Sequence, residues 1–182
     1  MIELTGKSAL ITGASRGIGA ATAVLFAKAG ANVAITYTKH RKDAEHVMRH
    51  VEAYGKNAIA IQGNVAKENH VRRAVDAAIA SLGKIDILVN NAGVWTYGAI
   101  GKMDRKVWDE TIDVNLTGTF LMCNAVIPHM RNRKYGRIVN VSSTAGQRGE
   151  AYHCHYAAAK GGVIAFTKSL AAELASENIL VN

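Results

Sequence analysis

The residues in this sequence best suited to acid–base chemistry are a tyrosine and a lysine one helical turn apart, Tyr156 and Lys160. Side chains at positions i and i+4 of a helix share a face, so the phenol and the ammonium group should lie together. A free tyrosine, with a pKa of about 10, exchanges protons poorly near neutral pH. A nearby cation lowers the pKa of a phenol, which would make Tyr156 a usable general acid or base. Ser143, just past an expected strand, can hydrogen-bond the same reacting oxygen.

A glycine-rich loop near the N-terminus can hold phosphate groups. Residues 12–19 read Thr-Gly-Ala-Ser-Arg-Gly-Ile-Gly, between an apolar run and a helical pattern. Glycines allow positive φ and close approach of a ligand, and a helix N-terminus offers unpaired N–H donors to phosphates. The spacing G-x-x-x-G-x-G differs from the general dinucleotide pattern, but its place after the first strand makes it a strong signal. The cofactor contacts predicted from this loop are Gly13, Ser15, Arg16, Gly17, Ile18 and Gly19.

Apolar runs and helical patterns alternate along the chain and define the expected fold. Such runs suit strands that are buried on both faces. The expected strands are 8–12, 32–37, 58–62, 85–90, 137–142 and 178–182, and helical spacing recurs at 44–51, 71–82, 104–132 and 155–177. Alternation of this kind predicts an α/β, doubly wound parallel sheet (a Rossmann fold) in a single domain, 1–182, with ligands at the carboxyl ends of the strands.

The end of the second expected strand indicates which dinucleotide is bound. NAD-binding members of this fold place Asp or Glu there to hold the ribose 2′-hydroxyl, whereas this chain has Tyr37. Lys39, Arg41 and Lys42 follow, and Arg16 lies in the glycine loop. Cations in place of a carboxylate suit a 2′-phosphate, so we expect NADP(H) to be preferred, with NAD(H) as the alternative.

Taken together, these motifs resemble those of the short-chain dehydrogenase/reductase family. The resemblance covers essentially the whole chain, and the motifs that carry it are the glycine loop, Asn90-Asn91-Ala92-Gly93, Asn115, Ser143 and Tyr156-x-x-x-Lys160. It implies a catalytic tetrad in which Tyr156 exchanges the proton and Ser143 polarises the substrate oxygen. Lys160 would hold the nicotinamide ribose and assist Tyr156, and Asn115 would anchor a proton-relaying water. The resemblance implies further cofactor contacts from Tyr37, Lys39, Asn64, Val65, Asn91, Ala92, Gly93, Tyr156 and Lys160.

Within that family, the chain is most similar to 3-oxoacyl-(acyl-carrier-protein) reductases of fatty acid biosynthesis. The resemblance implies a carbonyl or alcohol substrate. It also implies that a carrier-bound acyl thioester would dock on basic residues such as Arg131, Arg133 and Lys134. Glu177 argues against carrier docking, because carrier-binding relatives often have arginine there. The aromatic and imidazole residues Trp95, Tyr97, Tyr152, His153 and His155 favour instead a polar pocket for a sugar, polyol or ring ketone. A non-catalytic nucleotide-binding or scaffold protein is the remaining alternative, against which the intact tetrad argues.

Composition and charge indicate which partners and which cellular location to expect. The net charge of +8 favours anionic partners such as nucleotides, and no nucleic-acid motif accompanies it. No run is long and apolar enough for a membrane span, no cluster suggests a metal, and we expect a cytoplasmic protein. The sequence stops inside its last expected strand, so we expect the C-terminal part of the usual fold to lie outside it. In this family the helices that correspond to 104–132 and 155–177 commonly form homotetramers, so the resemblance implies a homo-oligomer, either a dimer or a tetramer.

Overall fold

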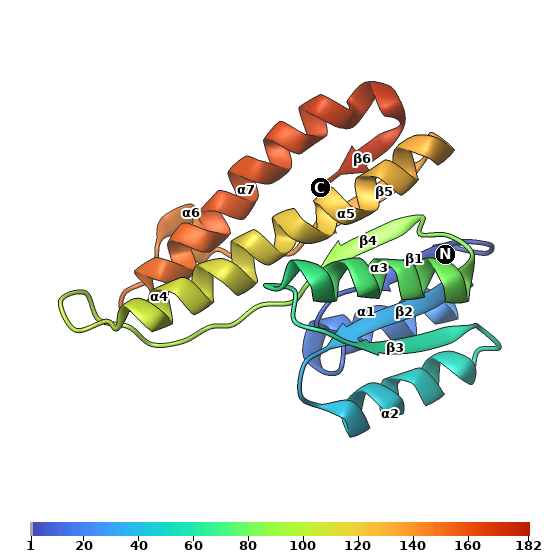
Figure 1. Ribbon diagram of the computed structural model, residues 1–182, viewed down its shortest axis with the longest axis horizontal. Coiled ribbons are helices and arrows are strands. Elements are labelled where there is room, and N and C mark those ends of the chain that lie inside the picture. The colour runs from blue at the N-terminus through green and yellow to red at the C-terminus, as the bar shows by residue number, and fades with distance from the viewer. Residues whose placement is uncertain (1) are drawn as a thin grey trace.

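The computed structural model describes residues 2–182 and contains one six-stranded parallel sheet in the order β3-β2-β1-β4-β5-β6 (Figure 1). The strands are β1 (Ser8–Ile11), β2 (Asn32–Tyr37), β3 (Ala58–Gln62), β4 (Ile87–Asn90), β5 (Gly136–Asn140) and β6 (Ile179–Val181). The helices are α1 (Gly17–Lys28), α2 (Arg41–Glu52), α3 (Glu68–Leu82), α4 (Arg105–Ile112), α5 (Gly118–Arg133), α6 (Ala145–Arg148) and α7 (Cys154–Leu174). The predicted doubly wound α/β fold is confirmed.

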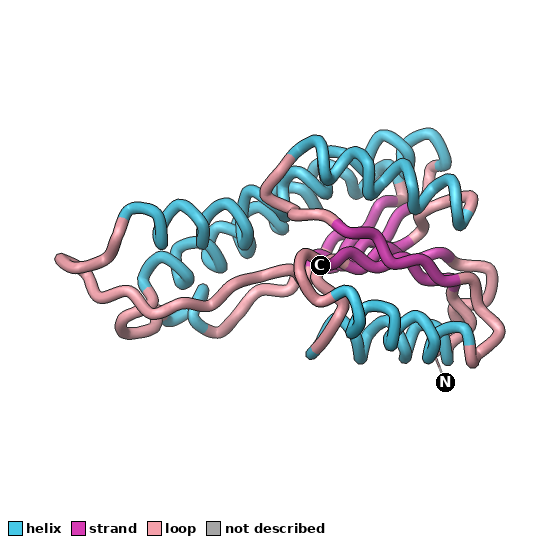
Figure 2. The backbone as a smooth tube through the Cα atoms, turned by 60° about the horizontal axis from the view of Figure 1, so that its bottom comes forward, coloured by secondary structure: helices cyan, strands magenta, loops and turns pink. Residues whose placement is uncertain are grey.

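Helices cover the sheet on both faces, and the alternation of side chains along β1 shows why. Ala9 and Ile11 pack into a core with α1 and α2, whereas Leu10 between them packs into a second core with α3, α5 and α7. Both faces of the inner strands are therefore buried, which explains their unbroken apolar sequence. Figure 2 shows the sheet between these two helical layers. Within residues 2–182, the side of β5 and β6 that faces away from α5 and α7 carries Val139 and Leu180, which are 40% and 46% exposed.

The predicted elements agree with the structure to within about two residues at most strand ends. The predicted helix 104–132 is continuous but not uniform, because a π-helical turn, Asp113–Thr117, separates α4 from α5. Helix α6 was not predicted, since four residues are too few to show a helical period. The predicted helix 155–177 ends in a short 3₁₀ turn, Ala175–Glu177, after α7.

The fold projects beyond the carboxyl edge of the sheet. The start of α7, the short α6, α4 and the loops that precede them extend away from the strands on one side (Figures 1 and 2). The loop after β4 contributes the residues from Asn91 to Asp104, and the loop after β5 contributes those from Val141 to Thr144. Both loops bring expected site residues to this edge. Along residues 2–182, no helix has the length and hydropathy needed to cross a membrane, and no cluster of three or more metal-ligating side chains occurs.

The opposite edge of the sheet is held by a buried carboxylate. Asp86, just before β4, is 1% exposed and accepts hydrogen bonds from Arg133 (2.9 Å) and from the backbone N–H of Ser8 (3.0 Å), and it pairs with Lys84 at 3.0 Å. Burial would by itself raise the pKa of the Asp86 carboxyl. The hydrogen bonds from Lys84, Arg133 and Ser8, with the charge of Lys84, outweigh burial and lower that pKa below its ordinary value.

This arrangement predicts a pH-dependent loss of stability in Asp86→Asn. The substitution leaves two cations without their partner, so the free energy of unfolding at pH 7 should fall by about 3 kcal/mol. Because the folded-state pKa is depressed, the stabilisation is present above the unfolded value and disappears as pH falls through the folded one. Urea unfolding at pH 7 and well below about pH 4, where the folded-state carboxyl is also protonated, checks this. The exposed Asp76→Asn is the matched control, and an equal deficit at both pH values would contradict the role of the charge.

Candidate active site

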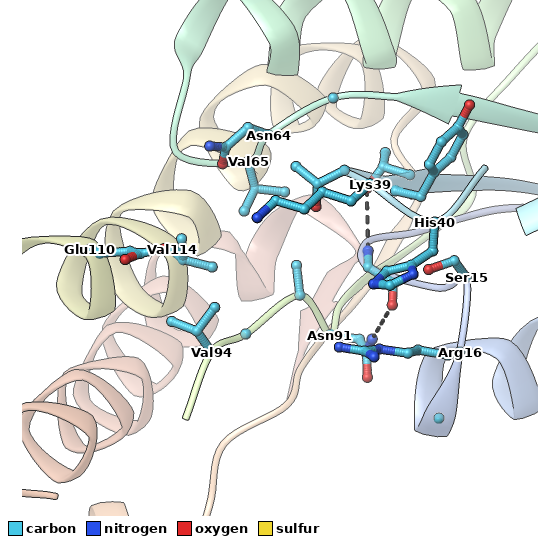
Figure 3. Close-up of a pocket in the computed structure, with 18 residues that line it drawn as sticks. Ser15, Arg16, Lys39, His40, Asn64, Val65, Asn91, Val94, Glu110 and Val114 are labelled. Atoms are coloured by element: carbon cyan, nitrogen blue, oxygen red, sulfur yellow. Dashed lines mark hydrogen bonds between the residues drawn. The ribbon is translucent and has the colours of Figure 1, made fainter. Parts of the chain in front are cut away.

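A cavity of about 540 Å³ lies at the carboxyl edge of the sheet, where the strand order reverses between β1 and β4 (Figure 3). Ligands in doubly wound sheets bind at this switch point. Predicted cofactor residues that line it are Gly13, Ser15, Arg16, Gly17, Tyr37, Lys39, Asn64, Val65, Asn91, Ala92 and Gly93. The structure thus brings residues from the loops after β1, β2, β3 and β4 into one cavity.

The glycine loop in this cavity has the geometry of a phosphate cradle. Gly13 and Gly17 have positive φ values of 63° and 60°. A Cβ on Gly13 would lie 2.8 Å from the Cα of Ala92, whereas one on Gly17 would meet nothing within 4 Å and would project into open space. No side chain caps the N-terminus of α1, so the backbone donors of its first turn are open to an anion. These features fit the diphosphate of a dinucleotide.

Two predicted cofactor contacts in the glycine loop do not line the cavity, and neither do the predicted contacts Tyr156 and Lys160. Ile18 is 68% exposed on the first turn of α1. Gly19 serves packing, because a Cβ there would lie 2.5 Å from the amide nitrogen of Asn91 and 2.8 Å from the Cα of Ala14. The motif therefore mixes ligand-facing glycines with one that lets helix α1 approach the loop after β4.

Positive charge gathers at the end of the cavity near β2. The cations Arg16 and Lys39 line it, and no acidic residue stands at the Tyr37 position. Arg41 is directed elsewhere, because its Nε donates to Glu45 at 2.8 Å along α2. Glu110 is the carboxylate among the lining residues, and it comes from α4 rather than from the β2 side (Figure 3).

A second cavity, of about 400 Å³, lies beside the loop after β5 and contains two predicted catalytic residues. Its lining consists of Trp95, Ser143, Thr144, Ala145, Arg148, Gly149, Glu150 and Tyr156. Ser143 Oγ accepts a hydrogen bond from the backbone N–H of Ala145 at 3.1 Å, which fixes the hydroxyl at the start of α6. The phenol of Tyr156 and the hydroxyl of Ser143 thus share one polar hollow.

Lys160 lies between the two cavities and is 5% exposed. Its Nζ donates to the carbonyl oxygen of Val141 at 2.6 Å and lies 5.9 Å from the centre of the Tyr156 ring. A Cβ on Gly93 would lie 3.8 Å from the same Nζ, so the ammonium is next to a wall of the first cavity. Burial lowers the pKa of Lys160 from 10.5 to about 8.

Asn115, fully buried in the π-helical turn, holds the segment between the cavities. Its side-chain amide donates to the carbonyl of Val94 at 2.9 Å, and its Oδ1 accepts from the N–H of Val94 at 3.2 Å. A Cβ on Gly93 would lie 2.7 Å from that Oδ1. Gly93 and Val94 line the first cavity and Trp95 lines the second, so Asn115 positions their shared wall.

The aromatic and imidazole residues expected around the substrate have separate places. Trp95 stacks on His153, with ring centres 4.4 Å apart and planes 3° from parallel. Tyr97 stacks on the exposed Tyr152 at 5.5 Å. His155 is fully buried and its Nε2 lies 3.2 Å from the hydroxyl of Thr96. Among these residues, Trp95 alone lines the second cavity, and the others support the loops around it.

Sequence reasoning missed several lining residues. Thr36, Thr38 and Gly63 flank predicted contacts at strand ends, so a wider window at each strand end would have included them. Glu110 and Val114 come from α4 and the π-helical turn, and only the fold brings them to the cavity. Arg148 and Glu150 belong to the loop region around the unpredicted α6.

The basic patch expected beside the entrance has another position in this chain. Arg131 and Arg133 are at the end of α5, at the edge of the sheet opposite the two cavities (Figure 1). Arg131 pairs with Glu177 at 2.8 Å and with Glu173 at 3.2 Å, and Arg133 pairs with Asp86. These cations are therefore largely compensated within the chain.

Comparisons with known proteins agree with this geometry. The short chain dehydrogenase family profile matches residues 7–182. The 3-oxoacyl-(acyl-carrier-protein) reductase of Synechocystis sp. is 43% identical over 182 residues, covering all of this chain and 74% of that protein. The corresponding reductase FabG of Staphylococcus epidermidis is 42% identical over 176 residues, covering 97% of this chain and 72% of the relative. The solved structure of an NAD⁺-bound xylitol dehydrogenase superposes with a TM-score of 0.94 at 35% identity, covering 98% of this chain and 69% of that one.

The chain belongs to the short-chain dehydrogenase family, as its motifs predict. Membership makes it an oxidoreductase that acts on alcohol and carbonyl groups.

The buried ammonium of Lys160 predicts a gain in stability when it is removed. At pH 7 the depressed pKa corresponds to a cost of about 3 kcal/mol, which exceeds the roughly 1 kcal/mol that one hydrogen bond contributes. Lys160→Met should therefore unfold at higher urea than the parent protein at pH 7. Because the folded-state pKa is lowered, the parent gains stability as pH rises from about 8 toward 10.5, and the difference should shrink there.

The control for this measurement is Lys168→Met, an exposed lysine on the same helix α7, which should change stability by less than about 0.5 kcal/mol. A Lys160→Met protein less stable than the parent by the same amount at every pH would show that the ammonium carries no burial cost.

Proposed function

We propose that this protein is an NADP(H)-dependent reductase of carbonyl compounds, most closely a 3-oxoacyl thioester reductase, which transfers a hydride between the nicotinamide and its substrate. The observation that carries the proposal is the convergence of Tyr156, Ser143 and Lys160 beside a dinucleotide-sized cavity. The relatives at 43% and 42% identity, both 3-oxoacyl-(acyl-carrier-protein) reductases, support the substrate class.

Each residue near the second cavity has a defined role in this proposal. The bound dinucleotide supplies the hydride at its nicotinamide ring. Ser143 donates a hydrogen bond to the substrate carbonyl oxygen, and Tyr156 delivers the proton to that oxygen as the alcohol forms. Lys160 places a buried positive charge near the phenol, which favours the phenolate left after proton transfer. Asn115 acts as a positioning residue, because its side chain holds the backbone at Val94.

The glycine loop and the β2 end would hold the cofactor. Backbone donors at the start of α1, with Ser15 and Gly17, would bind the diphosphate, and Arg16 and Lys39 would bind the 2′-phosphate. Asn64 and Val65 would border the adenine. The xylitol dehydrogenase relative is NAD⁺-bound, so the cofactor preference depends on the cations of this chain.

A second candidate substrate class is favoured by the polar lining of the second cavity. Ser143, Thr144, Arg148 and Glu150 offer donors and acceptors to several hydroxyl groups, and Trp95 offers a flat aromatic face. These groups suit a sugar or polyol, and the xylitol dehydrogenase relative is consistent with that class. Rates with an acetoacetyl thioester and with a pentitol distinguish the two substrate classes.

We also expect a cytoplasmic dimer or tetramer. Its location would be checked by localisation in cells, and its oligomeric state by light scattering.

Tyr156→Phe tests the proton-transfer step. The change removes one oxygen, so kcat/KM for an acetoacetyl thioester with NADPH should fall by about 10²–10⁴-fold. Cofactor binding, followed by quenching of intrinsic fluorescence, should persist. Tyr54→Phe, at an exposed tyrosine outside both cavities, is the matched control. A Tyr156→Phe enzyme with the parent value of kcat/KM would contradict the proposed mechanism.

The cofactor preference is tested by Arg16→Ala and Lys39→Ala. Losing one charged hydrogen bond to a phosphate costs about 1.5–3 kcal/mol, so kcat/KM with NADPH should fall by about tenfold or more in each variant. The rate with NADH should change much less, because that cofactor lacks the 2′-phosphate. Lys28→Ala, at the far end of α1, is the control. A parent enzyme faster with NADH, or variants equally slow with both cofactors, would contradict the assignment.

A further inference from the structure

We propose that Arg148 binds a second oxygen-bearing group of the substrate, so that the cavity beside Tyr156 selects 1,3-dicarbonyl compounds over simple ketones. This inference rests on the proposed carbonyl-reductase function and specifies its substrate. The group bound is an acceptor oxygen two carbons from the reacting carbonyl, which is a thioester carbonyl in a 3-oxoacyl thioester and a carboxylate in a 3-oxo acid.

The first line of evidence is that Arg148 is unpaired and lines the reaction cavity. Within residues 2–182 no carboxylate lies within 4.0 Å of its guanidinium, and no hydrogen bond of its side chain occurs. Five other arginines on helices donate to a carboxylate, namely Arg41, Arg72, Arg105, Arg131 and Arg133, whereas Arg73 donates to the carbonyl of Gln62. Among the described residues, Arg49 on α2 also lacks a carboxylate partner, but it lines neither cavity. A guanidinium has five N–H donors in a planar fork, which suits carbonyl and carboxylate acceptors.

The carboxylate in the same cavity is already engaged. Glu150 Oε2 accepts from the indole N–H of Trp95 at 3.3 Å, and its Oε1 lies 3.8 Å from the Nδ1 of His153. Trp95 is stacked on His153, so Glu150 joins the two rings into one wall. One oxygen of Glu150 is thus directed to that wall, and Arg148 is the cation among the residues that line the second cavity.

The backbone that carries Arg148 is fixed relative to the catalytic groups. A Cβ on Gly146 would lie 2.6 Å from the carbonyl carbon of Lys160, so α6 packs directly against the backbone of α7. The hydroxyl of Ser142 also donates to the carbonyl of Lys160 at 2.9 Å. Helix α6 ends at Arg148, where Gly149 has a φ of 78° that reverses the chain. Close packing therefore fixes the backbone from which the Arg148 side chain reaches the cavity, as selection between neighbouring groups requires.

The experiment compares three substrates at saturating NADPH: an acetoacetyl thioester, acetoacetate, and butanone, which has the same four carbons without the second oxygen. Arg148→Met should lower kcat/KM for both dicarbonyl compounds by about tenfold or more and leave butanone unchanged. Arg148→Lys should restore much of the rate with acetoacetate, since the positive charge returns. Arg49→Met, at an exposed arginine on α2, should behave as the parent enzyme.

The outcomes separate this inference from the proposed function. Equal losses on all three substrates would show a structural role for Arg148 and overturn the inference. An unchanged rate with both dicarbonyl compounds would overturn it too, as would a parent enzyme that reduces butanone as efficiently as acetoacetate. These results would leave carbonyl reduction standing, whereas a parent enzyme that binds NADPH and reduces none of the three would overturn both proposals.

Discussion

The buried ammonium of Lys160 contacts both loops that form the candidate site, and the rest of the site depends on these contacts. Its hydrogen bond to the Val141 carbonyl ties helix α7 to the loop after β5, and its position next to Gly93 brings it to the loop after β4. A cation at 5% exposure is costly to hold, and the depressed pKa measures that cost. The hydrogen bond from the ammonium to the Val141 carbonyl offsets part of that cost.

Parallel topology explains why such distant residues meet. Every strand delivers its carboxyl end to the same edge, so the loops after β1, β2, β3 and β4 line one cavity although they span residues 13–94. The loop after β5 and the start of α7 then form the second cavity next to it. The amino edge instead stabilises the fold, through the ion pairs of Asp86 with Lys84 and Arg133. Chemistry and stability are thus largely divided between opposite edges of one sheet.

Local sequence patterns predicted the sheet, its long helices and the glycine loop, because each depends on periodicity or on glycine at a turn. The family resemblance supplied the predicted cavity residues from Asn64 to Gly93. Tyr156 and Lys160 were recognisable for the same reason, since one helical turn relates them. Ile18 and Gly19 show that a motif does not identify which of its residues face the ligand. Ile18 is exposed to solvent, whereas Gly19 packs against Ala14 and Asn91. Glu110, Arg148 and the ion pairs of Arg131 were not predictable, because tertiary packing between separate segments places them.

The segment from Gly93 to Trp95 joins the two cavities physically. Gly93 and Val94 face the dinucleotide cavity, Trp95 faces the reaction cavity, and Asn115 holds both backbone groups of Val94. A π-helical turn is what brings the Asn115 side chain to this wall, since it interrupts the regular i to i−4 bonding between α4 and α5. Hydride transfer requires cofactor and substrate to meet at a fixed separation, and a wall held at both backbone groups provides that separation. If the proposed function holds, the π-helical turn therefore serves the chemistry and is not a defect of the fold.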